Sequence, residues 1–236
     1  MTSASNSFKL CCPGPKPHIA RSSNRAGGLA GLLREIRACT VCAERLPFPP
    51  RPIVRAASSA VLLVVGQAPG RRVQATGIPW NDPSGDRLRD WLGLTRDEFY
   101  DTRRIAIIPT AFCYPGTGQG GDLPPRPECA PRWHPRLRAA LPHLQLTLLI
   151  GRYAQAFYLG ERCRSSLAET VRAYREYLPH YLPLPHPSPR NQRWFQQHPW
   201  FEREILPELR QRLAALGFAS RGDSAGSRAP RRCNER

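Results

Sequence analysis

Four short apolar runs constrain the fold of this chain more than any other feature. They lie at residues 61–65, 105–108, 146–150 and 181–184, and segments with helical periodicity separate them. Continuous apolar strands that alternate with helices are typical of a parallel sheet covered on both faces. We therefore expect an α/β fold with three α/β/α layers around a central, mainly parallel sheet of four strands.

Helical segments are predicted at residues 29–38, 86–92, 152–158, 165–176 and 200–216. In a sheet of this kind, ligands bind beyond the carboxyl ends of the strands. The polar motifs of the chain follow the ends of predicted strands, so we expect them to meet at one edge of the sheet.

The two ends of the chain differ in composition from its middle. Residues 1–27 and 219–236 are rich in Ser, Gly, Pro and Arg and have no apolar period, so we expect disordered basic tails around one domain at 28–218. Of the formal net charge of +17, the tails carry +4 and +3, which leaves +10 on the domain. A basic domain favours a polyanionic partner such as DNA. Solubility in an arginine-rich proteome is the simpler alternative.

The eight cysteines are interpreted as free thiols or metal ligands. No apolar run approaches the ~18 residues of a membrane span, and no apolar core of a secretory signal is present. We therefore expect a cytoplasmic monomer with no membrane partner, in which the reducing pool opposes disulfides. Cys39 and Cys42 form a C-x-x-C motif, and fifteen residues separate Cys113 from Cys129. These four make a candidate ligand set. The others do not: Cys11, Cys12, Cys163 and Cys233.

Three segments carry the polar and glycine-rich motifs. A tight turn follows the first strand and consists of Gly66, Gln67, Ala68, Pro69 and Gly70. It matches neither the P-loop nor the dinucleotide fingerprint. Residues 76–86 then supply an aromatic ring, an amide and two carboxylates, from Trp80, Asn81, Asp82 and Asp86. The alternative for this segment is a helix N-cap made by Asp82 or Ser84, with Trp80 packing on it.

The third segment follows the fourth strand. His186 lies between two prolines, and Ser188, Arg190 and Asn191 come within five residues of it. Prolines make such a loop rigid and leave few backbone donors. Because hydroxyl, guanidinium and amide groups are common phosphate ligands, we interpret the segment as a polar loop that faces a phosphate.

Together these motifs resemble the iron–sulfur uracil-DNA glycosylases and their relatives in the same superfamily. The first family motif, G-E/Q/L-A-P-G/A followed by T-G-x-P-aromatic, is matched by residues 66–70 and 76–80, and the H-P-S motif by 186–188. The family places a C-x-x-C before the first strand and two cysteines about fifteen residues apart after the second. The matching cysteines are Cys39, Cys42, Cys113 and Cys129. The resemblance covers roughly residues 30–215.

The resemblance implies a DNA glycosylase that hydrolyses the N-glycosidic bond of uracil, and of other deaminated bases, after the nucleotide is flipped out of the helix. It also implies a [4Fe-4S] cluster with a structural role on the four matching cysteines. Tetrahedral zinc is the alternative, because four thiolates satisfy either group.

The resemblance also suggests roles for individual residues. Asp82 would stabilise the sugar cation or orient water, and His186 with backbone N–H groups near Gln67 would stabilise the departing base. If Asp82 points away, Gln67 would hold the water. Trp80 would stack on the flipped base, Asn81 and Asn191 are candidates to read its edge, and Ser188 and Arg190 would hold phosphates.

Two departures from the family pattern leave the substrate open. Pro109 stands where the iron–sulfur uracil enzymes usually place an Asn that reads uracil, and Gln67 stands where Glu is frequent. Residues 82–86 instead resemble the D-x-S-G segment of the branch with broader specificity. Because a fold does not imply an activity, the alternative is a catalytically inactive iron–sulfur protein that binds nucleic acid with the same fold. A zinc-stabilised nucleotide-binding module is a third interpretation.

Overall fold

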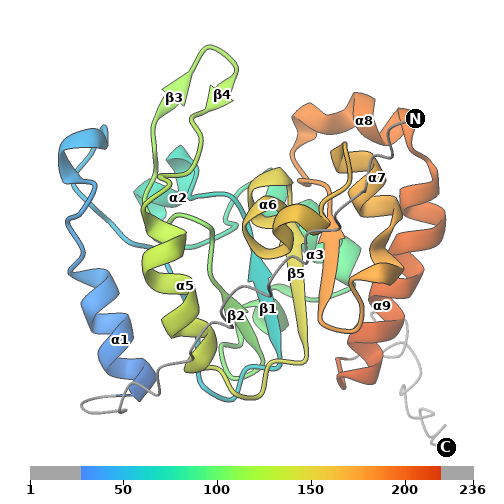
Figure 1. Ribbon diagram of the computed structural model, residues 1–236, viewed down its shortest axis with the longest axis horizontal. Helices are drawn as coiled ribbons and strands as arrows, with labels where there is room; N and C mark the ends of the chain where they lie inside the picture. Colours follow the sequence, from blue (N-terminus) through green and yellow to red (C-terminus); the bar gives the residue numbers. More distant parts are fainter. Residues whose placement is uncertain (1–27, 219–236) are drawn as a thin grey trace, which may run out of the picture.

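The computed structural model describes residues 28–218 (Figure 1). The two predicted tails lie outside this range. The central sheet contains β1 (Leu62–Val65), β2 (Ile105–Ile107), β5 (Leu146–Ile150) and β6 (Tyr181–Leu184) in the order β2-β1-β5-β6. All three pairings are parallel. The expected four-stranded parallel sheet is confirmed, and its strands lie within the four apolar runs.

Helices cover both faces of this sheet, as the continuous apolar strands predict. The side chains of β1 alternate between two apolar clusters. Leu62 and Val64 pack with helices α3, α4 and α9, whereas Leu63 and Val65 pack with α1, α5 and α6. The helices are α1 (Gly28–Arg37), α2 (Arg71–Thr76), α3 (Pro83–Leu92), α4 (Arg96–Tyr100), α5 (Cys129–Ala139), α6 (Arg152–Leu159), α7 (Leu167–Arg172), α8 (Gln192–Gln197) and α9 (Leu206–Ala215).

A small antiparallel hairpin stands apart from the central sheet. It consists of β3 (Thr117–Gly118) and β4 (Gly121–Asp122), and Figure 1 shows it projecting at the top of the molecule above α2 and α5. Strands of two residues are too short to show an alternating pattern, so the sequence does not predict this element. The hairpin lies between Cys113 and Cys129 in the chain.

Within the described range, no helix is both long and apolar enough to cross a membrane.

Candidate active site

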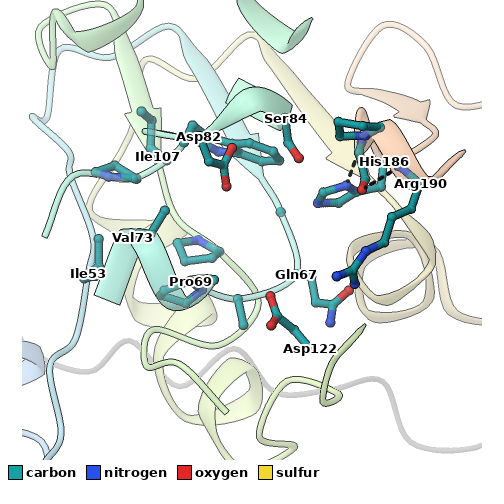
Figure 2. Close-up of a pocket in the computed structure, with 18 residues that line it drawn as sticks. Ile53, Gln67, Pro69, Val73, Asp82, Ser84, Ile107, Asp122, His186 and Arg190 are labelled. Atoms are coloured by element: carbon teal, nitrogen blue, oxygen red, sulfur yellow. Dashed lines mark hydrogen bonds between the residues drawn. The ribbon is translucent and has the colours of Figure 1, made fainter. Parts of the chain in front are cut away.

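A cavity of about 340 Å³ lies at the carboxyl ends of the strands (Figure 2). Its volume falls in the usual range for small-molecule sites. The turn after β1, the segment before α3, the loop after β6 and the hairpin all contribute to its wall. Ten of the residues that the sequence singles out line it: Gly66, Gln67, Ala68, Pro69, Gly70, Trp80, Asp82, His186, Ser188 and Arg190.

Asp82 has two roles in this wall. It is the N-cap of α3, and its Oδ1 accepts a hydrogen bond from the backbone N–H of Gly85 at 2.9 Å. Its carboxylate also lines the cavity, and Figure 2 shows it on the cavity side of the helix start. The N-cap interpretation and the site interpretation of this residue therefore hold together. One oxygen is engaged by the helix, which leaves the second for a ligand.

Trp80 is held in an unusual backbone conformation. Its φ is +56°, in the left-handed region that costs a residue other than glycine about 1–3 kcal/mol. Two glycines make room for it. A Cβ on Gly66 would lie 2.7 Å from the indole ring, and a Cβ on Gly85 would lie 1.7 Å from the carbonyl oxygen of Trp80. Gly66 of the first turn and Gly85 of the D-x-S-G segment are thus both required by the same tryptophan.

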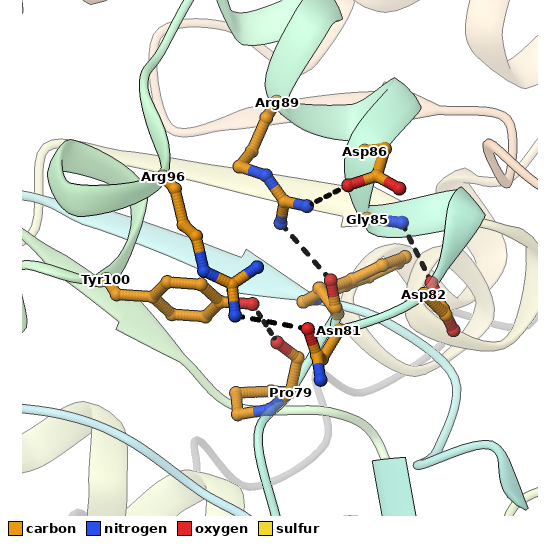
Figure 3. A network of polar contacts seen from close by, with 9 residues as sticks. Pro79, Asn81, Asp82, Gly85, Asp86, Arg89, Arg96 and Tyr100 are labelled. Carbon is orange, nitrogen blue, oxygen red and sulfur yellow. Dashed lines mark hydrogen bonds and ion pairs between the residues drawn. The ribbon is translucent and has the colours of Figure 1, made fainter. Parts of the chain in front are cut away.

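Two polar side chains hold the backbone around Trp80, and a carboxylate supports one of them (Figure 3). Arg89, which is 5% exposed, donates to the carbonyl of Trp80 at 3.2 Å and pairs with Asp86 at 2.5 Å. Tyr100 donates its hydroxyl to the carbonyl of Pro79 at 2.7 Å. These bonds pair two backbone carbonyls and hold the chain at the strained residue, while the indole ring packs against Gly66 and His186. The sequence motifs do not identify Arg89 or Tyr100, because both residues lie outside the motifs and act on backbone carbonyls.

His186 faces Trp80 inside the cavity, with 5.5 Å between the ring centroids. The backbone N–H of Ser188 donates to its Nδ1 at 3.2 Å. A backbone N–H can only donate, so Nδ1 carries the lone pair and the ring proton resides on Nε2. Burial lowers the pKa of His186, while the Asp82 carboxylate acts in the opposite direction. The imidazole is therefore neutral at pH 7 and has a donor at Nε2.

The two asparagines proposed as base readers are placed elsewhere. Asn81 accepts a hydrogen bond from Arg96 at 3.1 Å, and Asn191 donates to the carbonyl of His186 at 2.8 Å. Neither is part of the cavity wall. Asn191 instead stabilises the loop that carries His186. Gln67 does line the cavity, but its amide nitrogen donates to the carbonyl of Leu123 at 3.2 Å, so it also anchors the hairpin.

The hairpin adds an acid that the sequence motifs do not identify. Asp122 lines the cavity and approaches the first turn, where its Oδ2 lies 3.2 Å from the position of a Cβ on Gly70. Burial raises the pKa of Asp122, and the nearby Asp82 charge adds to this, whereas Arg190 and the Tyr114 hydroxyl lower it. Only a Gly-Asp pair in a Pro/Gly-rich segment marks Asp122 in the sequence, which is too common a pattern to identify it.

Pro109 also lines the cavity, at the position where the resemblance places a uracil-reading Asn. Its carbonyl accepts a hydrogen bond from Nε2 of His134 at 3.0 Å, and Nδ1 of His134 accepts from the Tyr158 hydroxyl at 2.8 Å. Burial lowers the pKa of His134 to about 4. This neutral, fully bonded histidine supports the cavity wall from behind.

The four candidate cysteine ligands come together between α1, α5 and the segment after β2. Their thiols line one cavity, separate from the one above: Cys39, Cys42, Cys113 and Cys129. Burial raises the pKa of Cys113 to about 11 and of Cys129 to about 12. Among residues 28–218, no group of three His, Cys, Asp or Glu side chains has the arrangement of a site for a single metal ion. Cys163 lies outside this cavity.

A comparison with known families matches most of the domain. The family described as the uracil DNA glycosylase superfamily matches residues 54–210, which is more than half of the 236 residues. The match includes the first turn, the segment before α3, the hairpin and the loop with His186. All parts of the cavity wall except Ile53 therefore lie inside the matched region.

Proposed function

This chain belongs to the uracil DNA glycosylase superfamily, and from that premise we propose that it hydrolyses the N-glycosidic bond of deaminated bases in DNA. Membership in the superfamily supports a DNA glycosylase function. Uracil, with hypoxanthine and xanthine as further bases, is the substrate class that we propose. One observation carries the proposal: Asp82 and His186 line the same cavity, beside an aromatic ring that is held rigidly.

The two polar side chains suit the two charges that develop as the bond breaks. Positive charge grows on the sugar and negative charge on the departing base. The carboxylate of Asp82 would stabilise the sugar cation or orient the attacking water through the oxygen that does not cap α3. The neutral His186, with its proton on Nε2, would donate a hydrogen bond to an oxygen of the departing base. A neutral donor avoids the competing ion pair that an imidazolium would form with Asp82.

The target base must leave the helix to reach this cavity, which costs a few kcal/mol, on the order of 2–4, and less at a mismatch. Stacking on Trp80 would return about 1–3 kcal/mol. Because the network around Arg89 fixes the ring beforehand, little conformational entropy is lost when the base arrives. Exposed arginines beside the first turn, Arg71 and Arg72, would contact the phosphates.

We also propose that the four cysteines hold a [4Fe-4S] cluster. The support for this is the donor set: four thiols line one cavity and come from three segments far apart in the chain. Such a cluster would connect the end of α1 with the segment after β2 and the start of α5. Its role would be structural, because this cavity is separate from the one that holds Asp82 and His186.

The test of the function is the release of free base in a single turnover. Anaerobically purified protein would be mixed in excess with oligonucleotides that carry one uracil, hypoxanthine or xanthine, as single strands and as duplexes. We expect release of more than one of these bases. Binding of the oligonucleotides without release of any base would overturn the proposal and favour a protein that binds nucleic acid without catalysis.

A further inference from the structure

Three consecutive residues, the two of β4 and the one after it, each approach a different part of the cavity wall. Gly121 has a φ of +125°, and the position of a Cβ on it would lie 2.2 Å from a guanidinium nitrogen of Arg190. Asp122 approaches Gly70, and the carbonyl of Leu123 accepts the hydrogen bond from Gln67. The hairpin is therefore anchored over the cavity at this point, and Figure 2 shows Asp122 and Arg190 at the same side of it.

This arrangement places an acceptor and a donor next to each other. The carboxyl oxygens of Asp122 can accept a hydrogen bond, and the guanidinium of Arg190 can only donate. Both side chains line the cavity. Within residues 28–218 the guanidinium of Arg190 donates no hydrogen bond, and its charge lowers the pKa of the Asp122 carboxyl beside it. Asp82, the other carboxylate in the wall, is partly engaged by the N-terminus of α3.

Deaminated bases share one edge that fits such a pair. Deamination replaces an amino group with a carbonyl and converts the adjacent ring nitrogen from an acceptor into an N–H donor. Uracil, hypoxanthine and xanthine therefore all present an N–H beside a C=O. Cytosine and adenine present a lone pair and an amino group at the same positions. In a fixed pose, Asp122 would face that lone pair and Arg190 would face that amino group, which are both repulsive contacts.

We propose that Asp122 and Arg190 together read the N–H and C=O edge of the flipped base, and that Asp122 is the residue that selects uracil over cytosine and hypoxanthine over adenine. The inference rests on the proposed function in that a flipped base must occupy the cavity. It accounts for recognition of the base although position 109, in the cavity wall, is a proline and not the Asn of the resemblance. The backbone nitrogen of Pro109 has no proton to donate. It also accounts for a broad substrate range, because the edge is common to pyrimidines and purines.

The test measures binding, so that it does not depend on catalysis. The probe is an oligonucleotide with one 2′-fluoro-2′-deoxyuridine, whose fluorine withdraws electrons from the sugar and prevents formation of the cation. Two further probes carry its N3-methyl derivative or 2′-fluoro-2′-deoxycytidine. Fluorescence anisotropy gives the affinity of the wild-type chain for each. We expect the uracil probe to bind about 10- to 100-fold more tightly than either of the others, as for a hydrogen bond to a charged group.

Three variants separate edge reading from a structural effect. Asp122→Ala should bring the ratio against the methylated probe close to one and should reduce the ratio against the cytosine probe, where the contact of the amino group with Arg190 remains. Asp122→Asn keeps an acceptor oxygen and adds a donor, so it should keep the preference over the methylated probe and reduce the preference over cytosine. Asp97→Ala, which removes an exposed acid on α4, should change neither ratio. Ratios that stay at the wild-type values in Asp122→Ala would overturn the inference.

The failure of this inference can be told apart from failure of the proposed function. Release of uracil with ratios that do not depend on Asp122 leaves the glycosylase function standing and removes Asp122 from recognition. Ratios that depend on Asp122, in a protein that releases no base, leave the edge reading standing and remove the catalytic function.

Discussion

Replacing Asp82 separates its role in the helix from its role in the reaction. Asparagine is as good an N-cap as aspartate, so Asp82→Asn keeps the hydrogen bond from Gly85 and loses only the charge near the start of α3. The loss of that charge costs about 0.3–1 kcal/mol of folding free energy. Asp82→Ala also loses the cap, which costs about 1 kcal/mol more. The two variants should thus differ in stability.

Their effects on catalysis should be the same. Both remove the carboxylate that we assign to the sugar cation or the water, so both should slow single-turnover release of uracil by ~10²-fold or more. That factor corresponds to about 2.7 kcal/mol of transition-state stabilisation. Urea unfolding measures the stability and rapid-quench release measures the rate. Equal rate losses with unequal stability losses would establish the chemical role.

Ser166 offers a matched control. It is the N-cap of α7 and accepts from the backbone N–H of Glu169 at 3.2 Å, outside the cavity wall. Ser166→Ala should lose about 1 kcal/mol of stability and keep the rate of release. If Asp82→Asn releases uracil at the wild-type rate while Asp82→Ala does not, Asp82 acts only as a cap and the reasoning about its charge is wrong.

Three further outcomes follow from the structure. Thiolate-bound iron gives a broad absorption near ~400 nm, and substituting any one of the four clustered cysteines by Ser should abolish it. The control Cys163→Ser should keep this absorption. Stoichiometric zinc without iron in anaerobic protein would contradict the cluster. Burial holds the pKa of His134 at about 4 in the folded protein, below the value of 6.5 that is ordinary for histidine, so on acidification the unfolded chain takes up this proton first. The free energy of unfolding should therefore fall by up to about 3 kcal/mol between pH 6.5 and 4. His134→Gln should remove this dependence on pH, and the control His143→Gln, at an exposed site, should keep it. The same dependence in His134→Gln would exclude His134 as its source. The logarithm of the DNA-binding constant should fall linearly with the logarithm of the salt concentration. Arg71→Ala and Arg72→Ala should each reduce the steepness of this line by about one. An unchanged slope would show that these arginines do not contact phosphates.

The sequence predicts the parts of this molecule that depend on local patterns. The strands of the sheet are continuous apolar runs, and the turn after β1 is a short segment rich in glycine and proline, so the sequence alone predicts both. Helix α5 is not predicted, because Pro135 lies inside it and proline is the strongest helix breaker. Helix α4 is too short to show a helical period, and the capping box of Thr95 and Glu98 is the local signal that marks its start.

The candidate site shows the same limit more sharply. Asp82 and His186 stand in motifs, and the parallel sheet brings the motifs together at its carboxyl edge. Arg89 and Asp122 stand outside the motifs: Arg89 acts through the carbonyl of Trp80, and Asp122 reaches the cavity through a hairpin. The position of Asn81 outside the cavity wall has a related cause, because residue type alone does not say which way a side chain turns.

The hairpin lies in a segment that connects the two cavities described above. Its chain leaves the cysteine cavity at Cys113 and returns to it at Cys129, so both ends of the segment lie at the same set of thiols. The bond from Gln67 to the carbonyl of Leu123, the residue after β4, anchors the base of the hairpin to the first turn. Asp122 lies next to this anchor, which restricts its conformations, and that is what a residue needs to present an acceptor in a fixed pose. Gln67, which stands where the family often has an acid, is therefore explained by the hairpin it anchors: an amide can donate to the carbonyl of Leu123, and a carboxylate cannot.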